Sequence, residues 1–121
     1  MIPWRLLVAG GLLLAAPVCA HEASGRNGGR VADAGPYHLE LVARERTVDV
    51  YVLDGAEAPL PAAGFTATAF LMIDGKPARI ALAPAGGSRL TGLAEAALPA
   101  APKGAVQLTA PDGSRASARF N

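Results

Sequence analysis

The sequence predicts an all-β fold, an immunoglobulin-like antiparallel β-sandwich of about seven strands preceded by a signal peptide. Two observations predict it. Apolar and polar residues alternate with a period of two along several short segments, and Gly- or Pro-containing turns separate these segments at intervals of roughly 8–12 residues. The 14 Gly and 10 Pro make up about a fifth of the 121 residues, which exceeds average usage without a collagen-like or low-complexity pattern. The length fits one domain.

The first expected strands cover residues 37–43 and 47–53, where apolar residues alternate with polar ones around a charged bend at 44–46. The pattern places Asp49 and Tyr51 on the solvent side of the second strand. A Pro-containing connection at 54–64 is long enough to cross between sheets. The next strand covers 65–73, and its continuous apolar end, from Phe70 to Ile73, is expected to be buried on both faces.

The remaining strands are expected at 78–83, 89–93, 105–110 and 115–120. Asp74-Gly75 and Asp112-Gly113 are hairpin signals, because Gly tolerates the positive φ that a tight turn requires. Gly86-Gly87 marks another turn, and two prolines argue against a helix in 95–104. The inward face of these strands gives the expected core: Leu39, Leu41, Val48, Val50, Val52, Leu71, Ile73, Ile80, Leu82, Val106, Leu108 and Phe120.

The first 20 residues have the features of a signal peptide. Arg5 precedes an uncharged run from Leu6 to Val18, which is too short to span a bilayer but typical of the apolar region of a signal peptide. Val18 and Ala20 occupy the small-residue positions of a cleavage site ahead of His21. A buried N-terminal helix and lipid attachment at Cys19 are the alternatives. Export predicts a periplasmic protein without stable membrane insertion after cleavage.

Cleavage after Ala20 removes the only Cys and one cation, and leaves the Lys and Arg count equal to the 10 acidic residues. A chain without Cys suits an oxidising compartment and rules out disulfide, zinc-ribbon and thiol-redox functions. Because its charges are balanced and scattered, we expect no basic surface that would attract a nucleic acid or an anionic membrane. Residues 21–36 are expected to form a flexible, Gly-rich leader, and 37–121 the β-sandwich domain.

Groups for catalysis are sparse after residue 20. The chain has no Gly-x-Ser-x-Gly elbow, and no sequence cue joins two carboxylates into a glycosidase pair. The segment Gly86-Gly87-Ser88 lacks the Lys and the following helix of a phosphate loop. We therefore expect a protein that is not an enzyme.

His21 is the strongest candidate for metal binding. After cleavage it carries a free α-amine and an imidazole, whose ordinary pKa values are about 7.7–8.0 and about 6.5. Together they can chelate one ion, and nitrogen ligands in tetragonal geometry suit Cu(II). The alternative is that His21 simply ends a leader.

His38 and Glu40 are candidate further ligands. They are two residues apart on one expected strand, so their side chains leave the same face roughly 6.5–7 Å apart. A flexible leader would let His21 fold back onto them. The alternative is a pair of solvated surface residues. Met72 is a possible thioether ligand for Cu(I), but its apolar strand favours a core position.

The segment from Gly28 to Asp54, with its Tyr-His-x-Glu-Leu-Val strand, is followed by a Leu-x-Pro-x-Gly segment and a closing 113–120. This pattern resembles a family of small exported bacterial β-sandwich proteins with a His- and Gly-rich leader. The family is associated with periplasmic heavy-metal and copper efflux systems. The resemblance implies a role in metal homeostasis and a periplasmic efflux adaptor as partner. The matching positions are His21, His38 and Glu40.

Together these features predict a non-catalytic periplasmic accessory protein that captures Cu(II), or Zn(II), weakly through His21, His38 and Glu40. The alternative is a metal-free module that docks on an envelope protein through a sheet edge. A small hydrolase would require His38 to lie beside a Ser and an Asp.

Overall fold

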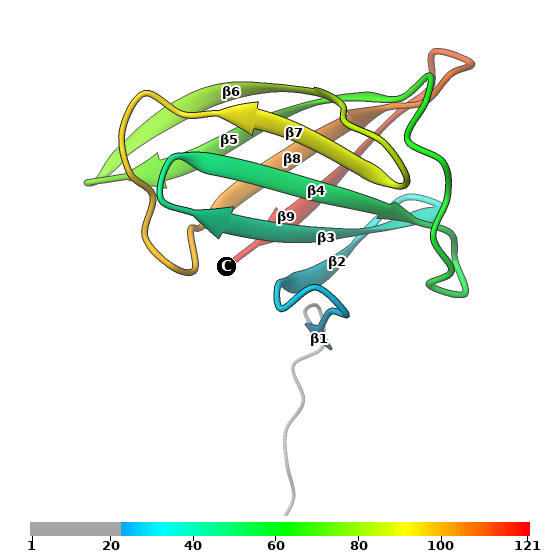
Figure 1. Cartoon of the computed structure of the whole chain (residues 1–121), viewed down its shortest axis with the longest axis horizontal. Helices are drawn as coiled ribbons and strands as arrows, with labels where there is room; N and C mark the ends of the chain where they lie inside the picture. Colours follow the sequence, from blue (N-terminus) through cyan, green and yellow to red (C-terminus); the bar gives the residue numbers. More distant parts are fainter. Residues whose placement is uncertain (1–22) are drawn as a thin grey trace, which may run out of the picture.

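Nine strands and no helix make up residues 23–121, the part of the chain that the computed structural model describes (Figure 1). They form one antiparallel sheet in the order β1-β2-β3-β4-β7-β6-β5-β8-β9, curled into a half-barrel. The strands are β1 (Ala23–Ser24), β2 (Arg30–Ala34), β3 (Tyr37–Arg44), β4 (Thr47–Leu53), β5 (Thr66–Ile73), β6 (Lys76–Pro84), β7 (Arg89–Leu93), β8 (Gly104–Thr109) and β9 (Arg115–Phe120).

The predicted all-β class is confirmed, and each of the seven expected strands is present. The sheet is continuous because β6 pairs with β7 through Ala83↔Thr91 and Pro84↔Leu90. The curl lays β5, β6, β8 and β9 across β2, β3, β4 and β7, and the core fills the space between these two halves (Figure 1). The predicted signal peptide lies outside the described residues.

The segment expected to be a flexible leader, 21–36, contains β1 and β2, so the β domain begins before the predicted boundary at residue 37. All five residues of β2 pair with β3, and Val31, Ala32 and Ala34 are buried. Ala32 and Ala34 complete the core, whereas Val31 is buried on the outer side, opposite Glu40. The Gly-rich composition of the segment indicated neither.

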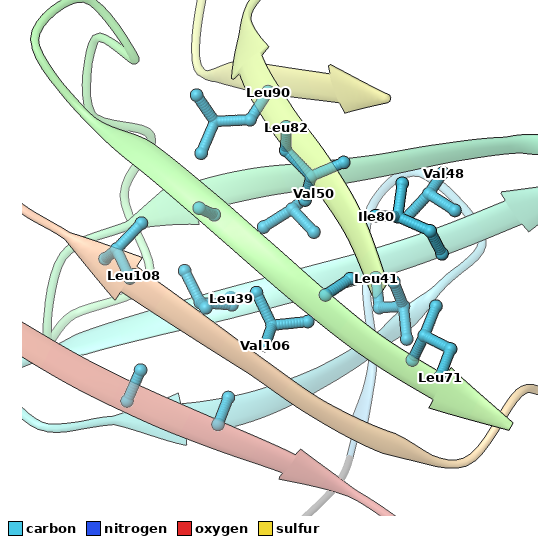
Figure 2. Close-up of a cluster of buried hydrophobic side chains, with 14 of the residues drawn as sticks. Leu39, Leu41, Val48, Val50, Leu71, Ile80, Leu82, Leu90, Val106 and Leu108 are labelled. Carbon is cyan, nitrogen blue, oxygen red and sulfur yellow. The ribbon is translucent and has the colours of Figure 1, made fainter. Parts of the chain in front are cut away.

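The expected core is confirmed, since all twelve side chains are buried and most are shown in Figure 2. The connections add three buried residues that the period-two pattern could not identify, Ala62, Ala94 and Leu98, while β7 adds Leu90. Phe65, expected as a core residue at a strand end, is buried just before β5. Phe65 meets the Tyr37 ring edge to face at 5.4 Å. The expected Asp74-Gly75 hairpin is also confirmed, and both residues have the positive φ (52° and 79°) of a type I′ turn.

The two edges of the half-barrel meet where β2 lies beside β9 (Figure 1). Arg30 joins them. Its guanidinium donates to the carbonyl oxygens of Pro102 and Asn121 and lies 5.4 Å from the centre of the Phe120 ring. One side chain therefore connects the N-terminal and C-terminal edges of the sheet.

The outer surface of the sheet has two parts that differ in cover. On the first, formed by β2, β3, β4 and β7, the outward side chains of Glu40, Val42 and Asp49 are buried, while Asp33 and Leu93 at its margins are exposed. On the second, formed by β5, β6, β8 and β9, the outward side chains are exposed or half-buried. We call these the covered face and the bare face.

Candidate functional site

His38 lies on the covered face, in a row across the strands that runs Asp33, His38, Leu53. Its Nε2 is 2.8 Å from Asp33 Oδ1, and its Nδ1 is 3.8 Å from Glu57 Oε2. The ring is thus held between two carboxylates from different parts of the chain. The Asp33 side chain is 80% exposed and that of His38 is 21% exposed, so solvent reaches this pair from the Asp33 side.

The two ring nitrogens have different surroundings. Nε2 has Asp33 as a partner, whereas Nδ1 is buried and has no hydrogen-bond partner within residues 23–121. A buried polar atom without a partner is unusual in a protein interior. Glu57 is the carboxylate nearest to Nδ1, and a shift of less than about 1 Å would bring it within hydrogen-bond distance.

The loop after β4 places Glu57 beside the ring. Asp54 Oδ1 accepts hydrogen bonds from the backbone N–H groups of Ala56 (2.8 Å) and Ala58 (2.9 Å). This side-chain turn holds the loop, with Glu57 in the left-handed region at φ 64°. A bridge between Leu53 and Pro59 closes it. The site is therefore built from β2, β3 and an ordered loop.

Glu40, the third predicted ligand, has a different role. Its side chain is 1% exposed, and its carboxylate accepts three hydrogen bonds from the turn before β2. The donors are the backbone N–H of Asn27 (2.8 Å), the Asn27 Nδ2 (2.9 Å) and the backbone N–H of Gly29 (2.8 Å). Both oxygens are thereby engaged in anchoring the N-terminal turn, a role that the sequence pattern did not indicate.

The turn lies directly on the strand beneath it. A Cβ at Gly29 would come within 2.2 Å of the Leu41 carbonyl oxygen, so only Gly fits this close approach.

One more residue of the covered face departs from expectation. Asp49 was predicted on the solvent side but is 6% exposed, where it accepts a 2.6 Å hydrogen bond from Thr91 Oγ1 and lies 3.5 Å from Arg89 Nη1.

His21 lies outside the described residues. Within residues 23–121, no group of three or more His, Asp, Glu or Cys side chains is arranged to hold a metal ion. The structure does bring His38 together with Asp33 and Glu57, two partners that the sequence analysis missed. Nothing in the sequence joins these three residues, because the pairing of β2 and the loop after β4 create the contact.

Two further expectations concern the rest of the chain. Gly86-Gly87 forms the turn between β6 and β7, as predicted, with the Arg89 N–H donating to the Gly86 carbonyl oxygen. Met72 was expected in the core but is 38% exposed, since its strand alternates between core and solvent to its end.

The chain matches no protein-family model, and the comparisons with curated proteins and with solved structures also found no match. In the part that the structure describes, no helix has the length and apolar character needed to cross a bilayer.

Proposed function

We propose that the protein is an exported, periplasmic and non-catalytic accessory of metal homeostasis, which captures Cu(II), or less strongly Zn(II), at His38 and Asp33 with His21 as the third residue. One observation carries the proposal. The Nε2 of His38 lies 2.8 Å from a carboxylate oxygen of the exposed Asp33 side chain, while the other ring nitrogen faces a second carboxylate. This ligand set retains His21 and His38 and replaces Glu40 by Asp33.

β1 brings the start of the described chain beside the strand that carries Asp33. It pairs with β2 through Ser24↔Arg30 and Ala23↔Val31, and Asp33 of β2 lies opposite His38 of β3. Residues directly opposite each other in an antiparallel pair share a face of the sheet, so Asp33 and His38 present their side chains together. In this proposal the α-amine and imidazole of His21 supply the remaining nitrogen ligands.

The chemistry of the donors suits a borderline metal. Imidazole and amine nitrogens with one carboxylate oxygen favour Cu(II), which heads the affinity order of the divalent first-row metals. Ligand atoms bind such ions at about 2.0–2.2 Å, and the exposed Asp33 carboxylate is free to move back to admit one. Glu57 would accept a hydrogen bond from the Nδ1–H group of His38. A His that binds a metal through one ring nitrogen commonly donates its other N–H to a carboxylate, which fixes the orientation of the ring.

Calorimetric titration with Cu(II) tests the proposal on protein that begins at His21. Protein that begins at Ala23 should bind at least about tenfold more weakly, as should Asp33→Asn and His38→Gln. Glu95→Gln, which removes an exposed carboxylate far from the site, is the matched control and should bind normally. Equal affinity in the protein that begins at Ala23 would contradict the role of His21, and equal affinity in Asp33→Asn would contradict the site.

Acidification should release the metal, because protons compete for the imidazole and amine nitrogens that bind it. Binding measured at pH 7.5 and again below about pH 6 should therefore weaken steeply. Affinity that does not change over this range would contradict nitrogen ligation.

The alternative function is a metal-free interaction module that docks on an efflux adaptor or another envelope protein. The observation in its favour is that β9 pairs only with β8 among the described strands. β2 lies beside the other edge of β9 without pairing to it, so a partner strand would insert between β9 and β2. The metal content of the protein purified from its native compartment separates the two functions.

The proposed metal-capturing function also includes two expectations from the sequence. These are export directed by a signal peptide in residues 1–20, and an immunoglobulin-like arrangement of the two halves of the sheet.

A further inference from the structure

The bare face carries large apolar and cationic side chains that the proposed metal site does not use. β5 alternates strictly, with Thr66, Thr68, Phe70 and Met72 pointing outward. Phe70 is 40% exposed, although the sequence predicted that this end of the strand is buried on both faces. Nothing in the described chain packs over it. The outward cations around it are Arg79, Lys103, Arg115 and Arg119, and with Phe70 and Met72 we call them the arginine face.

The strand register places these residues side by side. Phe70 lies opposite Arg79 on one side and opposite Ala105 on the other, and Ala105 lies opposite Arg119. The backbone N–H of Met72 donates to the carbonyl oxygen of Lys103, so the lysine is beside Met72. Neighbouring strands lie about 4.8 Å apart. Arg79, Lys103 and Arg119 therefore lie within a few strand spacings of the two apolar side chains. Arg115 lies farther along the same face, in the row of Thr109 and Thr66.

The strands of the arginine face carry charge of one sign. β5, β6, β8 and β9 contain no Asp or Glu, and carboxylates flank the face instead, with Asp74 in the β5–β6 turn and Asp33 lining one hollow with Arg119. None of Arg79, Arg115 and Arg119 forms an ion pair within residues 23–121, whereas Arg89 on the covered face pairs with Asp49. The chain is close to neutral as a whole, but the fold separates its charges. From the sequence we expected scattered charge, and the grouping of cations on this face is the observation that supports a binding role for the face.

The shape of the face favours a broad, deformable partner. It is the outer, convex side of the curled sheet (Figure 1). Between the cations its side chains are small or uncharged, for example Ala81, Gln107 and Ser117, so Phe70 and Met72 project from an otherwise low surface. Apolar side chains ringed by Arg and Lys are the pattern of a surface that lies against anionic lipid.

We propose that the arginine face binds the surface of a lipid bilayer that carries anionic headgroups. The arginines contact lipid phosphates, while Phe70 and Met72 enter the boundary between headgroups and acyl chains. The binding is peripheral and reversible. Each cation near such a surface contributes about fivefold in affinity, and salt screens the attraction. This proposal is independent of metal binding at His38.

Cosedimentation with vesicles tests the proposal on protein that begins at His21. Phosphatidylcholine vesicles with and without phosphatidylglycerol should separate the electrostatic part of binding. The protein should bind only the anionic vesicles, and less strongly as NaCl is added. Arg115→Glu with Arg119→Glu should reduce binding by roughly 25-fold or more. Arg26→Glu with Arg44→Glu reverses two exposed arginines away from the face and is the matched control, so it should bind like the unaltered protein.

Replacing Phe70 and Met72 tests the apolar part of the proposed membrane contact. Phe70→Ser with Met72→Ser should weaken vesicle binding without changing its salt dependence. Unaltered urea unfolding midpoints show that each variant is folded. The proposal fails if anionic vesicles are not bound, if the control variant loses as much as Arg115→Glu with Arg119→Glu, or if polyglutamate binds as tightly as the vesicles and Phe70→Ser with Met72→Ser changes nothing. The last result would identify an acidic protein as the partner.

Discussion

The covered and bare faces belong to one sheet and follow the same alternation of side chains, yet they differ in what lies above them. On the covered face, Glu40 and Asp49 are buried carboxylates with hydrogen-bond donors supplied by the chain. On the bare face, Phe70 and Met72 remain exposed beside arginines that form no ion pair within residues 23–121. The alternation of side chains therefore locates the core but does not determine the role of the opposite side of each strand. The covered face should therefore contribute to stability, and the bare face to external contacts.

Removing the Glu40 carboxylate should give the largest effect. Glu40→Ala leaves the buried backbone N–H groups of Asn27 and Gly29 without their acceptor and opens a cavity beneath the turn. We expect a loss of about 3 kcal/mol or more in the free energy of unfolding, measured with urea. Gln107→Ala on the bare face is the control and should change the same quantity by less than about 0.5 kcal/mol. Similar losses in the two variants would remove the distinction between the faces.

Arg30 is located where the two halves meet, and its replacement should have an intermediate effect. Arg30→Met keeps the aliphatic stem but removes the donors to Pro102 and Asn121 and the contact with the Phe120 ring. We expect a loss of about 1–2 kcal/mol in the free energy of unfolding and faster hydrogen exchange in β9. Arg26→Met is the control. A stability equal to that of the control would show that Arg30 does not hold the edges together.

The smallest effect should be at the turn between β8 and β9, beyond the end of the bare face. The Ser114 side chain and backbone N–H donate to the Asp112 carboxylate (2.7 and 2.9 Å), and these hydrogen bonds lower the pKa of Asp112 below its usual value. Because the folded-state pKa is lowered, this interaction stabilises the fold above about pH 4 and is lost as the pH falls through the folded-state pKa.

Ser114→Ala should raise the pKa of Asp112 toward its ordinary value, as measured by an NMR titration of the carboxyl group. Ser117→Ala, on the strand that follows, should not move it. If Ser114→Ala leaves the titration unchanged, the hydrogen bonds of this turn do not determine the acidity of Asp112.

The sequence predicted the strands and the core because both depend on a local period of two. It did not predict the burial of Glu40, since the turn that covers this residue has no periodicity and its N–H donors are 11 and 13 residues away along the chain. It placed Phe70 and Met72 inside because their run is apolar, although the described chain offers nothing to cover them. It identified His38 as a candidate ligand but not Asp33 or Glu57. Those contacts depend on the pairing of β2 and on the loop after β4, which no local pattern specifies.

The position of bound copper tests the central claim most directly. A substoichiometric amount of Cu(II), added to 15N-labelled protein that begins at His21, broadens the resonances of nearby amides. Selective loss of the Asp33, His38 and Glu57 amide signals is expected, with those of Phe70 and Glu95 unchanged. Broadening centred elsewhere, or none at a concentration where imidazole and amine ligands bind Cu(II), would contradict a metal site on the covered face.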